Sequence, residues 1–269
     1  MGYLKKPKCL LTAGCSFSQV PNADITWPVH LRDRLHAENC LFLGQGAAGN
    51  GIISRKVIYH TQKMLKIYKP EEILVGIMWS GRDRLEMYST NKDFPHQKFS
   101  SFAEGYRNPV RVANDYNFYL LNAHWNDEAT QLYMKHYYDE IGAYILSLEH
   151  ILRTQWFLQR VGVPYFMCEY SVDCLPTRDI TISQHPDVQY LLDLIDMSAW
   201  LPIDNMWQWS TDTGIPFARP PDPHPSTEHH IKFVADIVLV HLFRRGLVIP
   251  PPPEETSTAP VKNSEAQEQ

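Results

Sequence analysis

The chain has 269 residues, of which 44% are hydrophobic and 20% are charged, and 30 acidic against 25 basic side chains give a net charge of −5. This balance argues against a nucleic-acid-binding protein that relies on a broad basic surface, and no apolar run is long enough for a membrane span. Five scattered cysteines and the absence of a signal-peptide pattern lead us to expect a cytoplasmic protein with reduced thiols.

Apolar patterns along the chain predict alternating strands and helices. Short apolar runs bounded by glycine or proline are typical of buried strands, and they occur at residues 8–13, 40–43, 72–79 and 164–170. Apolar residues at helical spacing predict helices at 27–36, 52–68, 127–161 (one helix or a pair) and 225–245. This alternation predicts an α/β fold with a mainly parallel sheet covered on both faces.

Residues 1–249 are expected to form a single domain. Within it, residues 93–126 are aromatic and polar without a clear period, and we interpret them as an irregular insertion or lid. Residues 250–269 begin with four prolines and contain almost no large apolar side chain, so they predict a disordered acidic tail.

Polar and glycine-rich segments follow the predicted strands, at the edge of the sheet where α/β proteins bind ligands. These segments are 14–18 (GCSFS), 44–51 (GQGAAGNG), 79–84 (WSGRDR) and, before the last helix, 222–226 (DPHPS). A serine becomes nucleophilic when an imidazole accepts its proton and a carboxylate orients that imidazole. We therefore predict Ser16 as the nucleophile, His224 as the base and Asp222 as the orienting carboxylate.

Acyl transfer through a serine also needs an oxyanion hole, a set of donors aimed at the developing negative charge. The backbone N–H groups of Ser16 and Gly46 and the side chain of Asn50 are the predicted donors. The register of the glycine-rich loop leaves Ala47 and Gly49 as alternatives to Gly46.

The order of these segments resembles the SGNH (GDSL-like) hydrolase superfamily of esterases, lipases and carbohydrate deacetylases. The resemblance covers about residues 9–245 and rests on Gly14-Cys-Ser-Phe-Ser18, on the glycine loop 44–50 and on Asp222-Pro-His-Pro225. It is greatest to uncharacterised SGNH-like proteins of tailed bacteriophages. It implies a three-layer α/β/α sandwich with a flavodoxin-like sheet, no cofactor or metal, and a location in the host cytoplasm or the virion.

Two segments depart from the family pattern. The third segment of the family is Gly-x-Asn-Asp, whose Asn donates to the oxyanion, whereas this chain has Trp79-Ser80-Gly81 at that place. By this resemblance Ser80 is the substitute donor, through its hydroxyl group. The last segment has Asp-x-His where Asp-x-x-His is commoner, a spacing that some carbohydrate-acylating relatives share.

Several residues beside the motifs have both a functional and a structural interpretation. Trp79 and Arg84 are predicted to line the substrate pocket, with the guanidinium binding a carboxylate or a sugar acid. The structural alternative for Arg84, and for the neighbouring Arg82, is an ion pair with Asp83 or Glu86. Cys15 is interpreted as a small buried residue rather than as the reactive group.

The predicted function is a serine esterase that hydrolyses an O-acyl ester, with an acetylated carbohydrate as substrate and no nucleic-acid or membrane partner. An SGNH-like binding or virion-associated protein without hydrolytic activity is the alternative, which the altered third segment favours, and an acyltransferase is a third option. A metal site formed by Asp222 with His224, His229 and His230 is disfavoured by the spacing of the histidines.

Overall fold

A six-stranded sheet in the order β6-β5-β2-β1-β3-β8 forms the centre of the protein. This computed structural model describes residues 6–20, 25–88, 102–105, 108–111, 118–123, 128–171, 174–176, 179–218 and 224–249. The strands are β1 (Cys9–Ala13), β2 (Asn39–Phe42), β3 (Ile73–Trp79), β5 (Phe102–Gly105), β6 (Asn108–Arg111) and β8 (Tyr165–Glu169). Strands β2, β1, β3 and β8 are parallel, which confirms the predicted α/β class and its mainly parallel sheet.

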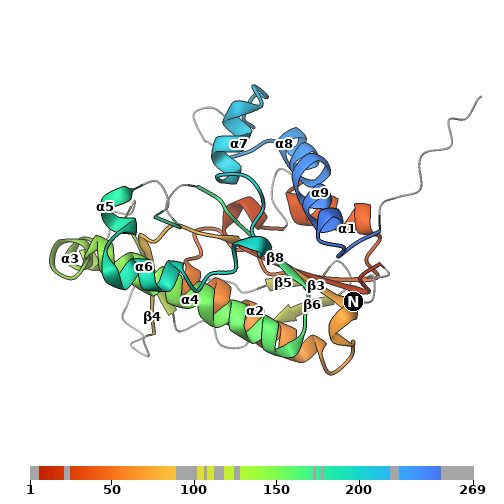
Figure 1. Cartoon of the computed structure of the whole chain (residues 1–269), viewed down its shortest axis with the longest axis horizontal. Helices are drawn as coiled ribbons and strands as arrows, with labels where there is room; N and C mark the ends of the chain where they lie inside the picture. Colours follow the sequence, from red (N-terminus) through yellow and green to blue (C-terminus); the bar gives the residue numbers. More distant parts are fainter. Residues whose placement is uncertain are drawn as a thin grey trace, which may run out of the picture.

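Helices pack against both faces of this sheet (Figure 1). Alternate residues of β3 point to opposite sides: Ile73, Val75 and Ile77 belong to one apolar core, and Leu74 and Met78 belong to the other. The first core is covered by α2 (Asn50–Met64), α4 (Glu140–Val161) and α6 (Pro186–Leu192). The second is covered by α1 (Trp27–Leu35), the π-helical η5 (Phe233–Val238) and α9 (Leu239–Arg244), and α8 (Thr227–Lys232) leads into η5.

The helix pair predicted from residue 127 is confirmed as α3 (Glu128–His136) and α4, and the remaining helices are α5 (Ile180–Ser183) and α7 (Met206–Asp212). The apolar spacing from residue 141 onward predicts one buried stripe made of Ile141, Ile145, Leu148, Leu152 and Trp156. This prediction is wrong at its end, because Trp156 is 52% exposed while Ile151, Gln155 and Leu158 are buried. Each step of four residues rotates by about 40° around an α-helix, so two such steps beyond Leu148 leave the buried face.

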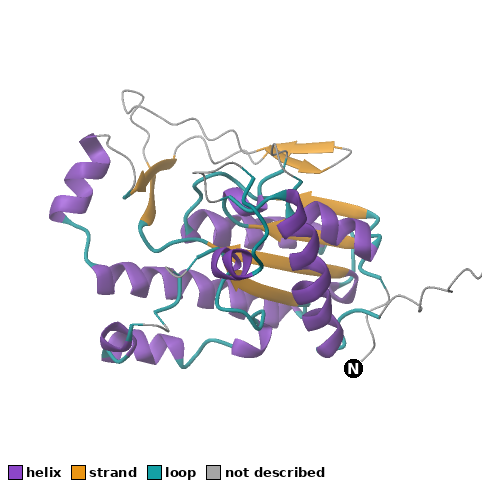
Figure 2. Cartoon of the chain, turned by 90° about the horizontal axis from the view of Figure 1, so that it is seen from above, coloured by secondary structure: helices purple, strands orange, loops and turns teal. Residues whose placement is uncertain are grey.

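The region interpreted as an irregular insertion contains regular strands, which corrects that prediction. β4 (Arg84–Tyr88) pairs antiparallel with β7 (Phe118–Asn122) in a separate two-stranded sheet, and β5 and β6 extend the main sheet at its β2 edge. Figure 2 shows this small sheet apart from the strands of the main one. The predicted tail, 250–269, lies outside the described residues.

The structure also bears on the cysteines and on membrane-spanning helices. All five cysteines are free thiols. Among the helices of the described residues, none combines the length and the hydrophobicity that crossing a membrane requires.

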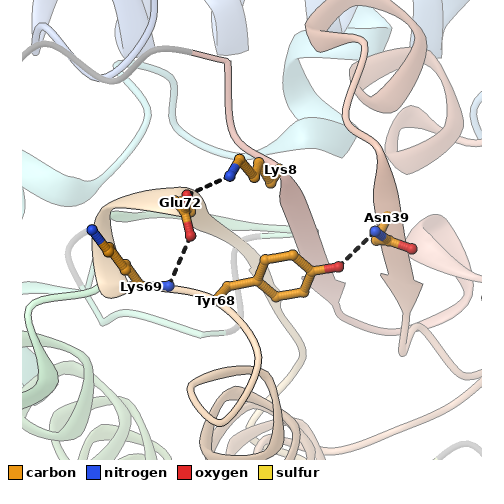
Figure 3. Close-up of polar contacts among 5 residues, drawn as sticks. All are labelled: Lys8, Asn39, Tyr68, Lys69 and Glu72. Carbon is orange, nitrogen blue, oxygen red and sulfur yellow. Dashed lines mark hydrogen bonds and ion pairs between the residues drawn. The ribbon is translucent and has the colours of Figure 1, made fainter.

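Side-chain contacts tie together the amino-terminal ends of the parallel strands (Figure 3). Lys8, just before β1, pairs with Glu72 at 2.7 Å, and Glu72 also accepts a hydrogen bond from the N–H of Lys69 at 2.9 Å. The amide of Asn39, at the start of β2, donates to the hydroxyl of Tyr68 at 2.6 Å. The loops predicted to carry the functional residues begin at the opposite edge of the sheet, where the parallel strands end.

Candidate active site

The loop after β1 places Ser16 beside His224. β1 ends at Ala13, and residues 16–18 form one 3-10 turn, η1 (Ser16–Ser18). Oγ of Ser16 lies 2.8 Å from Nε2 of His224, although 208 positions separate the two residues in the sequence. Both are only partly buried, so a ligand can reach them from solvent. The structure thus brings together two members of the predicted triad, and the third, Asp222, lies outside the described residues.

The segment that carries His224 is fixed by the start of α8. Ser226 is the N-cap residue, and its backbone N–H donates to Nδ1 of His229 at 3.0 Å. Nε2 of His229 faces the carbonyl oxygen of Ser210 at 3.2 Å, so both ring nitrogens of this buried histidine have protein partners. Burial lowers the pKa of His229. His229 therefore stabilises the start of α8, and because both of its ring nitrogens have protein partners, neither is available to bind a metal.

The glycine-rich loop after β2 packs closely against the Ser16 turn. A Cβ on Gly44 would lie 2.1 Å from the carbonyl oxygen of Ser18, so only glycine permits this approach of the two backbones. Gln19 forms an isolated parallel bridge with Gly44. Two residues further on, Gly46 is partly exposed, and within the described residues its N–H has no hydrogen-bond acceptor. That N–H is available to a ligand at Ser16.

Gly49, one predicted alternative to Gly46, lies beside the side chain of Glu86. The backbone at Gly49 and Ile52 lies beside the buried carboxylate of Glu86, and a Cβ on Gly49 would lie 2.4 Å from its Oε1. Burial raises the pKa of Glu86 to about 7, although Arg55 and the neighbouring backbone oppose the rise. The backbone of Gly49 therefore lies beside a carboxylate of the protein itself, which disfavours Gly49 as an oxyanion donor.

Asn50 braces two elements, which contradicts its predicted role as an oxyanion donor. Its Oδ1 accepts a hydrogen bond from the N–H of Ser80 at 2.8 Å, and its Nδ2 donates to the carbonyl oxygen of Ser80 at 3.0 Å. Nδ2 also donates to Oγ of Ser147 at 2.6 Å. Both amide hydrogens are thus used within the protein, and the side chain joins α2 to the end of β3 and to α4.

Two other predicted site residues lie deeper than expected. Trp79 is completely buried in the core between the sheet and α2 and α4, so it cannot line a pocket, which corrects that prediction. Ser80 is also completely buried, and its Oγ accepts a hydrogen bond from Nη1 of Arg84 at 2.7 Å. Trp79 continues the alternation of Val75 and Ile77 along β3 and so faces the same core.

Arg84, at the start of β4, reaches back over the end of β3. Its Nη2 donates to the hydroxyl of Tyr170 at 3.2 Å, and its guanidinium lies 5.0 Å from the centre of the Tyr170 ring. The alternative ion pair of Arg84 with Asp83 or Glu86 is not formed within 4.0 Å among the described residues. The neighbouring Arg82 instead pairs with Glu140.

Sequence reasoning missed two aromatic residues of the site. The Phe17 ring lies 5.0 Å from the imidazole of His224 and packs edge-on against Tyr170 at 5.4 Å. Tyr170 directly follows β8, so its position after a parallel strand was the signal that pointed to it. Burial raises the pKa of Tyr170, partly offset by Arg84, so its phenol stays protonated at neutral pH.

The chain belongs to a family of unknown function, DUF6071, whose model matches residues 18–254. The match includes the glycine-rich loop, Arg84 and His224, and it starts two residues after Ser16. A comparison with curated proteins finds no match.

Proposed function

We propose that this member of a family of unknown function is a serine esterase that hydrolyses an O-acyl ester, with an acetylated carbohydrate as its substrate class. The observation that carries the proposal is the 2.8 Å contact between Oγ of Ser16 and Nε2 of His224. A hydroxyl and an imidazole at this distance have the geometry that the nucleophile and base of acyl transfer require. The carbohydrate part rests on the resemblance to SGNH hydrolases.

The chemistry proceeds in two half-reactions. In the first, Oγ of Ser16 attacks the acyl carbon while its proton passes to Nε2 of His224. The imidazolium then gives this proton to the departing alkoxide, and an acyl-enzyme and an alcohol result. In the second, water repeats the attack with His224 as base, which releases the carboxylic acid and restores Ser16. Asp222, two residues before His224, is the carboxylate that we assign to orient the imidazole.

The arrangement of the two cores supports a three-layer α/β/α sandwich with a flavodoxin-like sheet, the fold of the SGNH hydrolases. Apolar residues of β3 alternate between the two cores, and each core is closed by helices. In such sheets the ligand site lies beyond the carboxyl ends of the strands. The Ser16 turn and the glycine-rich loop occupy that position.

Cys15 is the competing nucleophile, because a thiol is intrinsically more reactive than a hydroxyl. It is completely buried, whereas Ser16 is partly exposed and contacts the imidazole. A base within hydrogen-bond reach therefore favours the hydroxyl of Ser16.

The test is hydrolysis of p-nitrophenyl acetate combined with labelling by a fluorophosphonate, followed by intact mass. We expect one adduct on the wild type and a loss of activity of at least about 10³-fold in Ser16→Ala, with no adduct. Ser18→Ala is the matched control, because Ser18 lies in the same turn but is buried, its Oγ accepting from Nε1 of Trp27 at 2.9 Å. An adduct that persists in Ser16→Ala but disappears in Cys15→Ala would assign the chemistry to the thiol.

The altered third segment favours a second candidate, a binding protein without hydrolytic activity. It predicts that the folded wild type neither turns over the ester nor reacts with the probe. An acyltransferase is distinguished by adding an alcohol acceptor, which then competes with water for the acyl-enzyme.

A further inference from the structure

The guanidinium of Arg84 lies against the turn that carries the proposed nucleophile. It interacts with the thiol of Cys15, the residue before Ser16. It also donates to the carbonyl oxygen of Ala48 at 3.4 Å, two residues after Gly46 in the glycine-rich loop. Arg84 therefore contacts the glycine-rich loop and interacts electrostatically with the turn of Ser16, the two segments whose backbone N–H groups we assign to the oxyanion hole.

A chain of ring contacts connects the same guanidinium to the base. Arg84 stacks on Tyr170, Tyr170 meets Phe17 edge-on, and Phe17 contacts the imidazole of His224. Together with the hydrogen bond between Oγ of Ser16 and Nε2 of His224, these contacts connect Arg84 to the nucleophile. The arginine is thus part of the wall of the proposed site, although it starts a strand outside the main sheet.

The positive charge of Arg84 is not neutralised by a contacting carboxylate. Its hydrogen-bond partners are uncharged, namely Oγ of Ser80, the hydroxyl of Tyr170 and the carbonyl oxygen of Ala48. Among the described residues no carboxylate lies within 4.0 Å of it, Asp83 acts on it only from further away, and its Nε has no acceptor. An arginine side chain keeps its charge even when it is buried.

A partly buried cation without a contacting counter-charge stabilises negative charge that develops nearby. In acyl transfer that charge appears on the carbonyl oxygen, when the attack of the serine moves the π electron pair of the C=O bond onto oxygen. The charge disappears when the pair re-forms the C=O bond and the alkoxide leaves. A donor that is fixed before the reaction stabilises this intermediate without reorganisation.

We propose that Arg84 donates to the carbonyl oxygen of the ester in the tetrahedral intermediate, as a third oxyanion donor beside the N–H groups of Ser16 and Gly46. The assignment rests on the proposed esterase function. Ser80, which was predicted to donate directly, instead holds the guanidinium in place by accepting its Nη1–H.

The experiment compares Arg84→Met and Arg84→Lys with wild type on two p-nitrophenyl esters, one with a neutral acyl chain and one whose acyl chain ends in a carboxylate. We expect Arg84→Met to lower kcat about 10²–10³-fold on both esters, with KM changed by less than about threefold. Arg84→Lys should keep part of the activity. Added guanidinium ion should partly restore Arg84→Ala, a rescue that a purely structural role would not show.

Arg82→Met is the matched control, because Arg82 is two residues away, pairs with Glu140 and stacks on Tyr144 at 4.4 Å. We expect its kcat to stay within about threefold of wild type. If Arg84→Met does not fold, Arg84→Lys and the rescue of Arg84→Ala by guanidinium carry the comparison.

Three outcomes would overturn the proposal. Wild-type kcat in Arg84→Met, on the neutral ester as well, would remove Arg84 from the reaction. A loss confined to the anionic ester would make Arg84 a binding residue for a substrate carboxylate. A folded wild type that neither hydrolyses the esters nor reacts with the fluorophosphonate would overturn the esterase function, and with it this role.

Discussion

Substitution of Asn50 distinguishes two roles of its side chain: the structural brace that its contacts indicate and the oxyanion donor that the sequence predicts. Asn50→Ala leaves the N–H and carbonyl oxygen of Ser80 and the hydroxyl of Ser147 without their partner. All three residues are buried. A buried polar group that loses its hydrogen bond costs about 1–3 kcal/mol. Because water or small shifts will satisfy some of these groups, we expect a total loss of about 2–5 kcal/mol.

Urea unfolding at equilibrium, followed by tryptophan fluorescence, measures this loss directly. Asn39→Ala is the matched control, because the amide of Asn39 is exposed and makes one hydrogen bond, to Tyr68. The control should lose at most about 1 kcal/mol. A loss below about 1 kcal/mol in Asn50→Ala as well would refute the brace. If that stable variant also lost esterase activity by about 10²-fold or more, the oxyanion role would be restored.

Two further predictions concern backbone approach and buried charge. Gly44→Ala should lower both the stability and any esterase activity, because its Cβ would meet the carbonyl group of Ser18. In the control Gly142→Ala the new Cβ meets nothing closer than 3.5 Å, so its free energy of unfolding should rise by about 0.5–1 kcal/mol. Equal midpoints of urea unfolding for the two variants would contradict this prediction. Burial lowers the pKa of His60 to about 4 from 6.5, so the unfolded chain takes up this proton first and stability falls as the pH drops from 6.5 towards 4. His60→Leu should make that decline shallower. Urea unfolding at several pH values between 4 and 6.5 measures it, and an unchanged dependence of the free energy of unfolding on pH would contradict the prediction.

The position of the site was predictable from the sequence because it depends on topology. Apolar runs identified the parallel strands, and the segments after such strands must lie at one edge of the sheet. This rule alone places the turn of Ser16 beside the glycine-rich loop. The tertiary contact with His224, 208 residues away, was predictable only because its segment precedes a recognisable helix.

The functions of individual side chains at that edge were not predictable in the same way. Asn50 binds Ser147, 97 positions away, and no local pattern reports such a contact. Trp79 is different, because it continues the alternation of Val75 and Ile77 on β3, so the predicted strand 72–79 already implied that it faces the core. The strand β4 pairs with β7 across a long separation in the sequence, so the place of Arg84 on a strand was not visible either.

Several polar residues of the candidate site stabilise the fold instead of facing a ligand. Asn50 and Ser80 both lie where the sequence suggests catalytic donors, yet their hydrogen bonds join α2, β3 and β4 to one another. What reaches the surface of the site is a hydroxyl, an imidazole, one backbone N–H without an acceptor among the described residues, and a guanidinium held by neutral groups. Under the proposed esterase function, donors that are fixed in this way need not rearrange when negative charge develops on the substrate. The buried residues that hold these donors in place would therefore determine how strongly the donors stabilise that charge.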